Sequence, residues 1–406
     1  MRDVAVVGIG MTQFGKLAER SGKDLVREAV EAALTDAGVA RSELQAAYVG
    51  NSMAGLLWGQ ESIRGQVVLS AMGIDTIPIF NVENACASSS TAFHLAWLGV
   101  ASGQYDRVLA VGYEKLYHPD KQRSFQALAS AIDVENGSTF LRDFAARQGV
   151  TDVEFPEGGG RDRSIFMDMY SLWVRPYMKR YGLTQEHFAR LSVKSHRNAA
   201  KNPRAQYRKE VTLEEVLGSG EIVFPLTRMM CAPIGDGAAA AILCSKEQAA
   251  RLTTSPVWVA ASAVASGSLG SEGEAVAERL APRAYDQAGI GPADIDVIEV
   301  HDAAAPSEIM ALIQVGLCPG EEAGRWIEEG RLDLGGALPT NPSGGLQSKG
   351  HPVGATGLGQ IHEIVSQLRG TSGERQVSGC RVGMTQNGGG ILGADAAAMC
   401  LHIFNR

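Results

Sequence analysis

The chain alternates between short apolar runs and segments in which apolar residues recur every three or four positions. The apolar runs predict buried strands at Val4–Gly10, Ala46–Gly50 and Arg107–Glu114. Helical spacing predicts a helix over residues 22–37, which ends at Gly38. This alternation of strands and helices indicates a parallel, layered α/β domain.

Residues 115–222 break this rhythm, because they are polar and rich in charge. Two helices are predicted here, at Phe166–Tyr181 and Thr184–Asn202, and the second begins directly after Gly182. An excursion of this length between strands is typical of a lid or a binding subdomain. A dimerisation arm is the alternative interpretation.

The strand and helix pattern then restarts. Strands are predicted at Ala240–Cys244, Val257–Val264 and Cys380–Asn387, and a helix at Ala275–Ala288. Ala37-Gly38-Val39 recurs as Ala288-Gly289-Ile290 at a separation of 251 residues, and the strand end Val49-Gly50 recurs as Val300-His301 at the same separation. This repeat predicts a duplication, with an N-terminal half at 1–250, which includes the loop subdomain at about 115–222, and a C-terminal half at 251–406.

Composition excludes several classes of function. The 406 residues carry a net charge of −8, which argues against nonspecific binding of nucleic acid. No apolar run reaches the ~20 residues of a membrane span, and the N-terminus begins like a strand rather than a signal peptide. The six cysteines form no CxxC pair, which favours a cytoplasmic location and no structural zinc. The glycine turn at Gly8–Gly10 lacks the second half of a dinucleotide-binding fingerprint.

Cys86 is the first candidate for chemistry. It follows the apolar run Ile77–Phe80 and precedes small residues that lead into a predicted buried helix with Phe93 and Ala96 on one face. A thiol at a helix start is close to the positive end of the helix dipole, which favours the thiolate. The alternative is a buried structural cysteine.

Two histidines lie at loops that the duplication relates to the Cys86 region. His351 opens a predicted helix in the second copy of the Cys86 stretch, and His301 follows a strand end. A histidine beside a cysteine can take the thiol proton, and a second histidine can donate to the oxyanion that forms on attack. The glycines Gly388–Gly390 would let backbone N–H groups face the same oxygen. Alternatively, His301 caps a strand and His351 caps a helix.

The motifs around these residues resemble those of the thiolase superfamily. Asn84-Ala85-Cys86-Ala87-Ser88-Ser89 is similar to the nucleophile motif, and Gly350-His351-Pro352-Val353-Gly354-Ala355-Thr356-Gly357 to the G-H-P-x-G-x-x-G motif, which Asn341–Gly345 leads into. His301-Asp302-Ala303-Ala304 resembles the H-D-x-x segment of the sterol-carrier-protein-type thiolases.

The resemblance implies a fold and a set of roles. The fold would be two duplicated βαβαβαββ halves with an inserted loop subdomain. Cys86 would attack a CoA thioester, His351 would activate it, His301 would line the other oxyanion site, and the N–H groups of Cys86 and Gly388 would form the acyl-enzyme hole. The implied substrate-binding residues are Ser343, Gly344 and Asn387.

The resemblance also implies partners. Coenzyme A would be a substrate, with no bound cofactor and no metal. The protein would form a homodimer or a larger assembly, with the strand Arg107–Glu114 as a candidate interface. A small zinc-ribbon/OB-fold protein is a further candidate partner.

The chain departs from the family pattern at the second cysteine. The two positions where thiolases carry it are Gln386 and Ala303 here. The protein would therefore need another proton donor, such as His301 or a water. Asp302, Glu308 and Gln386 are candidates for acid/base support.

Three functions follow as hypotheses. Thiol-dependent cleavage or formation of a 3-oxoacyl-CoA with a bulky, branched or aromatic acyl group is favoured, because Cys86 and both histidines are kept. A retro-aldolase that acts on a CoA thioester with a zinc-ribbon/OB-fold partner is the alternative. A non-catalytic lipid-transfer or scaffold protein is a hypothesis of another class.

Overall fold

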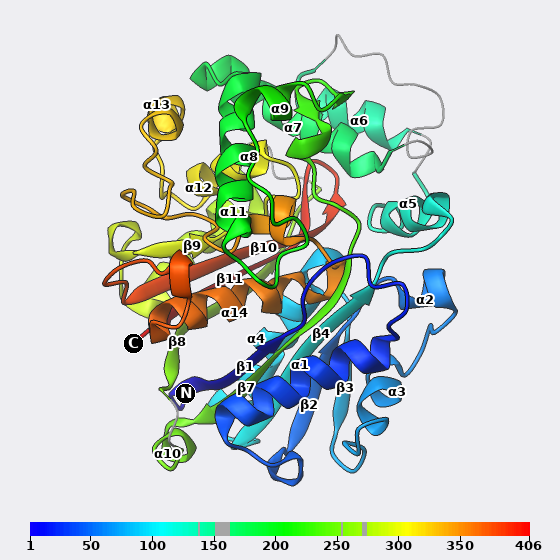
Figure 1. Ribbon diagram of the computed structural model, residues 1–406, viewed down its shortest axis with the longest axis vertical. Coiled ribbons are helices and arrows are strands. Elements are labelled where there is room, and N and C mark those ends of the chain that lie inside the picture. Colours follow the sequence, from blue (N-terminus) through cyan, green and yellow to red (C-terminus); the bar gives the residue numbers. More distant parts are fainter. Residues whose placement is uncertain (137–138, 151–162, 253–254, 270–273) are drawn as a thin grey trace.

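The computed structural model describes residues 1–136, 139–150, 163–252, 255–269 and 274–406 (Figure 1). The first part of the chain forms β1 (Val4–Met11), α1 (Gly22–Ala37), β2 (Ala46–Gly50), α2 (Ala54–Trp58), α3 (Arg64–Ser70), β3 (Ile79–Val82), α4 (Ser88–Ala101), β4 (Arg107–Lys115) and, after a long excursion, β7 (Asp236–Ser245). The predicted strands and the helix that ends at Gly38 are confirmed.

The excursion is mainly helical. It forms α5 (Lys121–Ala129), α6 (Phe140–Arg147), α7 (Ile165–Tyr181), α8 (Gln185–Ala200), α9 (Leu213–Leu217) and the small pair β5 (Glu221–Val223) and β6 (Leu226–Thr227). Both helices predicted here are confirmed, and Thr184 accepts a hydrogen bond from the N–H of His187 as the N-cap of α8. In Figure 1, α6, α7 and α9 gather at one end of the molecule, above the large sheet.

The remainder repeats the first order of elements. It contains α10 (Lys246–Ala249), β8 (Val257–Ser266), α11 (Val276–Ala288), β9 (Val297–Glu299), α12 (Pro306–Gln314), α13 (Ala323–Glu328), α14 (Thr356–Arg369), β10 (Val382–Leu392) and β11 (Asp395–Asn405). Both α1 and α11 end at a left-handed glycine, Gly38 (φ 66°) and Gly289 (φ 68°). The third strand of the second copy is reduced to a bridge between Ile298 and Thr340. The duplicated βαβαβαββ order is therefore present, whereas the division at residue 250 stays a prediction.

The strands form one sheet in the order β3-β2-β4-β7-β1-β8-β11-β10-β9. The predicted parallel arrangement is correct for β2 with β3 and β4, and for β9 with β10. It is wrong for β7 and β11, which pair antiparallel with both of their neighbours. β7 follows β4 in the chain after the helical excursion, runs antiparallel to it and separates β4 from β1 in the sheet.

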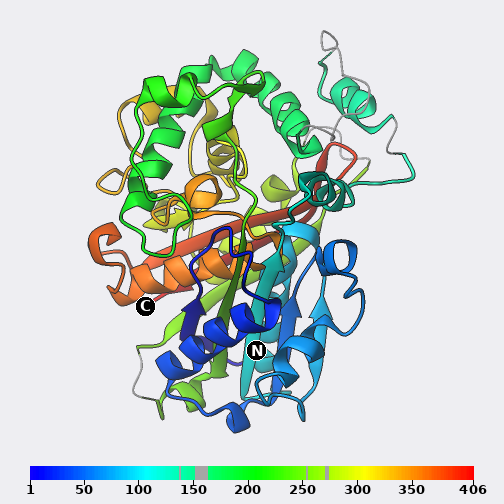
Figure 2. The same ribbon diagram turned by 45° about the vertical axis from the view of Figure 1, so that its right-hand side comes forward.

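Helices pack on both faces of the sheet, and two of them lie between its two halves (Figures 1 and 2). α1 packs on β1, β4 and β7, whereas α11 packs on β8 and β11. α4 and α14 contact each other and lie between the two copies, α4 against β2 and β4 and α14 against β10. The N-terminal ends of these two central helices carry the turns that hold Cys86 and His351.

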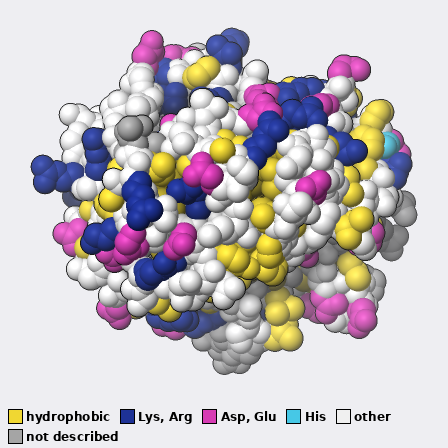
Figure 3. Space-filling view, turned by 90° about the horizontal axis from the view of Figure 1, so that it is seen from below, with side chains coloured by type: hydrophobic (Ala, Val, Ile, Leu, Met, Phe, Trp, Pro, Cys, Tyr) yellow, Lys and Arg dark blue, Asp and Glu magenta, His cyan; other side chains and the backbone are white. Residues whose placement is uncertain are grey.

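The prediction that the strand Arg107–Glu114 forms a subunit interface is wrong. All residues of β4 are buried, and β4 pairs with β2 on one edge and β7 on the other. The two terminal strands of the sheet are β3 and β9, and on β3 the Phe80 side chain is 43% exposed and stacks on Tyr48. Figure 3 shows apolar side chains reaching the surface between charged groups of both signs. Exposed apolar residues near β3 in the sequence are Leu56, Trp58 and Ile63.

No helix within the described ranges is both long and apolar enough to cross a membrane.

Candidate active site

The turn that holds Cys86 has a constrained backbone. Ala85 adopts a left-handed φ of 47°, which is uncommon for a residue with a side chain, and its N–H donates to Glu83 Oε1 at 2.6 Å. β10 passes so close to this turn that a Cβ on Gly389 would lie 2.1 Å from the Asn84 carbonyl oxygen. Only glycine fits there, and this close approach brings the backbone of β10 to the cysteine.

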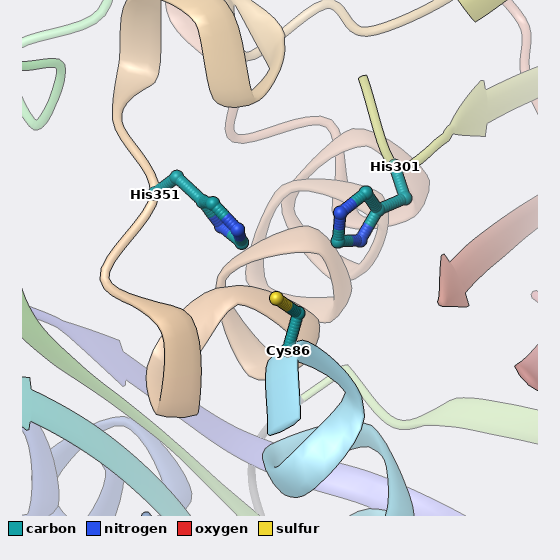
Figure 4. A group of neighbouring side chains, drawn as sticks. All are labelled: Cys86, His301 and His351. Carbon is teal, nitrogen blue, oxygen red and sulfur yellow. The ribbon is translucent and has the colours of Figure 1, made fainter. Parts of the chain in front are cut away.

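Cys86, His301 and His351 converge from three parts of the fold. One side-chain atom of each lies within 4.8 Å of the others, and each residue is only 8% exposed. The two imidazole rings are 5.2 Å apart and nearly perpendicular, at 84°. Figure 4 shows both rings pointing toward the sulfur from two sides. His301 follows β9, and His351 precedes α14, so the equivalent loops of the duplication meet here.

Hydrogen bonds set the tautomer of His351. Its Nδ1 lies 2.7 Å from the Thr356 hydroxyl, and that hydroxyl donates to the Pro352 carbonyl at 3.0 Å. Because the hydroxyl has one proton, Nδ1–H of His351 must donate to Thr356. Nε2 then carries a lone pair, and burial together with His301 lowers the pKa of His351 well below its usual range. His351 is a neutral base.

His301 has the opposite arrangement. The Asn387 amide Nδ2 donates to its Nδ1 at 3.0 Å, so the proton lies on Nε2. Burial lowers the pKa of His301 to about 4, which keeps the ring neutral. The backbone N–H of His301 donates to Gln386 Oε1 at 2.9 Å. His301 can therefore donate one hydrogen bond to an oxygen near Cys86, and Asn387 positions it rather than facing the cavity.

The resting thiol differs from the expectation. Burial raises the pKa of Cys86 to about 12, and the Glu114 carboxylate adds to the rise. The backbone N–H of Gly390 and that of Cys86 lower it by a smaller amount. The predicted preference for thiolate at the helix start is therefore outweighed by desolvation, and the resting Cys86 is a protonated thiol.

Sequence reasoning missed Glu114, which supports the turns on both sides of Cys86. Its carboxylate accepts the N–H groups of Ser52, Met53 and Gly354 at 3.0 to 3.2 Å, as well as the Asn51 amide. Burial raises the pKa of Glu114 to about 7, against these donors. The available signal was a charged residue at the end of an otherwise apolar strand.

The two carboxylates predicted as acid/base support are both engaged. Asp302 accepts from the N–H of Leu346 at 2.6 Å and from the Gln347 amide at 2.9 Å. Glu308 is 2.9 Å from Lys194 Nζ. Burial raises the pKa of both carboxyls. The Asp302 contacts hold the segment after Asn341, and Glu308 accepts a hydrogen bond from the Asn341 amide at 3.1 Å. Their part in proton transfer stays a prediction.

Two residues predicted to bind substrate lie away from the cavities. Ser343 is fully buried, and its N–H and hydroxyl both donate to Glu299, at 2.9 and 2.6 Å. Gly344 packs against Ala199, where a Cβ would approach to 2.5 Å. Neither residue lines the two cavities that reach Cys86. Both residues hold the loop before His351 against α8 and β9.

Two cavities meet at Cys86. The smaller has a volume of about 100 Å³ and contains His301, Gln386 and Gly388 in its wall, with Tyr170 and Met399. The larger has a volume of about 760 Å³ and reaches His351, Ala303 and Cys231. The thiol thus lies where a wide approach meets a narrow end.

Cys86, His301 and His351 are also the residue types that bind zinc, and within the described residues they are the one group close enough for it. A bound ion would occupy both the thiol and its base. We therefore keep the prediction that the site works without a metal.

Comparison with known proteins agrees with the fold. Residues 4–223 match the thiolase N-terminal domain, and residues 270–402 the thiolase C-terminal domain-like family. The chain is 41% identical to an acetyl-CoA acetyltransferase of Methanothermobacter thermautotrophicus over the whole of both chains. It is 35% identical to sterol carrier protein 2 of Bos taurus, over 96% of this chain and 71% of that protein.

Solved structures show the same fold. The chain resembles the Ltp2-ChsH2(DUF35) aldolase with a TM-score of 0.76 and 24% identity, over 98% of this chain and 97% of that one. With domains, motifs and relatives in agreement, the chain belongs to the thiolase superfamily, on its sterol-carrier-protein side, and is a thiolase-type acyltransferase.

Proposed function

We propose that this protein cleaves or forms a 3-oxoacyl-CoA through an acyl-enzyme on Cys86. The opposite tautomers of the two histidines carry the proposal. The unprotonated Nε2 of His351 takes the thiol proton, and Nε2–H of His301 donates to the substrate oxygen. The backbone N–H groups of Cys86 and Gly388 form the hole for the acyl-enzyme, with Gly390 beside the sulfur.

Charge in the larger cavity supports coenzyme A as the substrate carrier. The chain has a net charge of −8, yet the described residues that line this cavity include Lys16, Lys121 and Arg228 and no carboxylate. Arg163 also lines it, but its guanidinium is paired with Asp168. Phosphate groups bind where such cations gather. The phosphates would lie toward the cavity mouth and the thioester would reach Cys86.

The smaller cavity supports a short acyl group. Its volume of about 100 Å³ is far smaller than the 760 Å³ of the larger cavity. The bulky side chains of Phe166, Trp173 and Met310 line this cavity. We therefore propose acyl groups of acetyl to butyryl size, in place of the bulky, branched or aromatic group suggested by resemblance.

Mass spectrometry of the intact protein tests the proposed function. Wild type incubated with a series of acyl-CoAs should gain one acyl group, fastest with the short chains, and Cys86→Ser should gain none. Absence of any adduct together with cleavage of a 3-hydroxyacyl-CoA would favour the retro-aldolase. Absence of both, with bound lipid, would favour the lipid-transfer role.

We also propose that the protein is at least a homodimer. The unpaired edge of β3 and the exposed Phe80 support this, because such edges are normally covered. Light scattering should give twice the 43.0 kDa of one chain or more. A zinc-ribbon/OB-fold partner remains a prediction, which zinc analysis of the complex isolated from its source would test.

We propose a cytoplasmic location as well, supported by six free cysteines.

A further inference from the structure

Tyr170 places a hydroxyl beside the reacting groups without a partner. It belongs to α7 in the inserted segment, is 8% exposed, and lines both cavities that contain Cys86. Its hydroxyl makes no hydrogen bond to any residue that the structure describes, although buried tyrosine hydroxyls usually find one. A polar group of the substrate can supply the missing partner.

The proposed reaction requires a proton donor, and none has been assigned so far. Cleavage of the carbon–carbon bond leaves the electron pair on the α-carbon of acetyl-CoA as an enolate, which must be protonated. Gln386 lines the cavity but cannot ionise, and Ala303 has no polar side chain. Asp302 and Glu308 are held by the partners described above.

The other polar groups of the small cavity are committed or are weak acids. Asp395 accepts from the N–H of Val276 at 3.0 Å and forms an ion pair with Arg279. His301 has one proton, which faces the substrate oxygen. The Ser307 hydroxyl has no partner, but an aliphatic alcohol is a far weaker acid than a phenol. Among the described side chains of the small cavity, Tyr170 is the remaining group with a transferable proton.

We propose that Tyr170 is the proton donor and acceptor of the carbon–carbon step, an assignment that rests on the proposed function. In cleavage, the phenol gives its proton to the enolate carbon, which yields acetyl-CoA and a tyrosinate. The incoming coenzyme A thiol then gives its proton to the tyrosinate while its sulfur attacks the Cys86 thioester. Cys86 leaves as a thiolate and recovers its proton from His351, so the cycle closes.

The environment of the phenol is consistent with both transfers. Burial raises the pKa of Tyr170, and the nearby Cys86 and Asp302 add to the rise. The phenol is therefore neutral and holds its proton until the enolate, a much stronger base, forms. The thiol of coenzyme A is a stronger acid than the phenol, so the second transfer is also downhill.

Tyr170→Phe tests the assignment, because it removes only the hydroxyl. We expect Cys86 acylation by acetyl-CoA, followed by intact mass, to slow far less than cleavage, because the coenzyme A thiolate that leaves is a much weaker base than an enolate and depends less on the Tyr170 proton. Thiolytic cleavage of acetoacetyl-CoA should fall about a hundredfold or more. Exchange of the α-hydrogens of acetyl-CoA with D₂O should fall equally. Tyr177→Phe is the matched control, since Tyr177 lies on the same helix and its hydroxyl contacts Gln314 instead.

Three outcomes would overturn the assignment. Unchanged cleavage in Tyr170→Phe would exclude the hydroxyl, and an equal loss of acylation and cleavage would indicate a structural role. Cys231 lines the larger cavity, where its thiol donates to the Thr227 carbonyl, so loss of exchange in Cys231→Ala alone would assign the proton to that thiol. Failure of wild-type Cys86 to acylate would instead overturn the proposed function.

Discussion

The Thr356 hydroxyl lies 2.7 Å from Nδ1 of His351 and directs the other nitrogen of that ring toward Cys86. Thr356 is the first residue of α14, and its proton is already given to the Pro352 carbonyl. The same turn therefore begins the central helix and fixes the protonation of the base. A residue that touches neither substrate nor thiol thereby decides which nitrogen can accept a proton.

Replacement of Thr356 by valine should lower kcat with little change in KM. Valine keeps the shape but cannot accept from Nδ1–H, so the ring loses a hydrogen bond of about 1–1.5 kcal/mol, equivalent to roughly tenfold in rate. Thr356→Ser should recover most of the rate. Steady-state kinetics and a melting curve distinguish this from unfolding, and equal rates for valine and serine would refute the role.

Alkylation of Cys86 should show that the thiol carries almost no thiolate at neutral pH. Because burial and Glu114 raise the pKa of the thiol to about 12, the thiolate fraction should grow tenfold per pH unit from pH 7 to 10. Iodoacetamide labelling of the Cys86 peptide, measured by mass spectrometry, should follow this slope. Glu114→Gln removes a negative charge near the sulfur. This change should lower the pKa of Cys86 and speed its labelling at pH 8. A plateau in the wild-type rate below pH 8 would mean a preformed thiolate–imidazolium pair.

The sequence predicted those features that depend on neighbours in the chain. The turn at Cys86, the stop at Gly38 and the duplicated order of strands and helices all leave local patterns. Contacts across the fold leave none. Asn387 meets His301 across 86 residues, and Ser343 meets Glu299 across 44, so their partners could not be read from spacing.

Antiparallel β7 was missed for a related reason. Its apolar run has the composition of any buried strand, and direction depends on how the chain returns from the 115–222 segment. Tyr170 shares a helical face with Phe166 and Trp173, which reads as core packing. Its lack of a hydrogen-bond partner became visible only when its surroundings were known.

The buried ion pair of Lys349 and Glu299 should be essential to stability. Nζ lies 3.2 Å from Oε2, with the side chains 1% and 0% exposed. Lys349→Met leaves a buried charge unpaired and should reduce the free energy of unfolding by about 3–5 kcal/mol. Lys209→Met, in the exposed pair with Glu215, should leave the free energy of unfolding almost unchanged, because solvent screens such pairs. Urea unfolding with a refolding check measures both, and similar losses would show that burial does not matter here.

We expect the loss of His301 to affect the carbon–carbon step far more than the acylation of Cys86. Its Nε2–H is aimed by Asn387 at the substrate oxygen, and an oxyanion donor of this kind contributes about 3 kcal/mol, or roughly a hundredfold in rate. His301→Ala should therefore lower kcat for acetoacetyl-CoA cleavage by about that factor. Acylation of Cys86 by acetyl-CoA should persist, because it uses His351 and the backbone N–H groups.

His301→Asn is the informative companion. An asparagine amide can donate a hydrogen bond or position a water toward the same oxygen, so part of the lost rate should return, whereas His301→Leu should behave like alanine. Rapid-quench measurement of the acyl-enzyme, beside steady-state cleavage, separates the two half-reactions. If His301→Ala abolished acylation of Cys86 and left cleavage untouched, the roles of the two histidines would be reversed. Cleavage independent of Cys86, by an aldolase-like route, would then explain the site better.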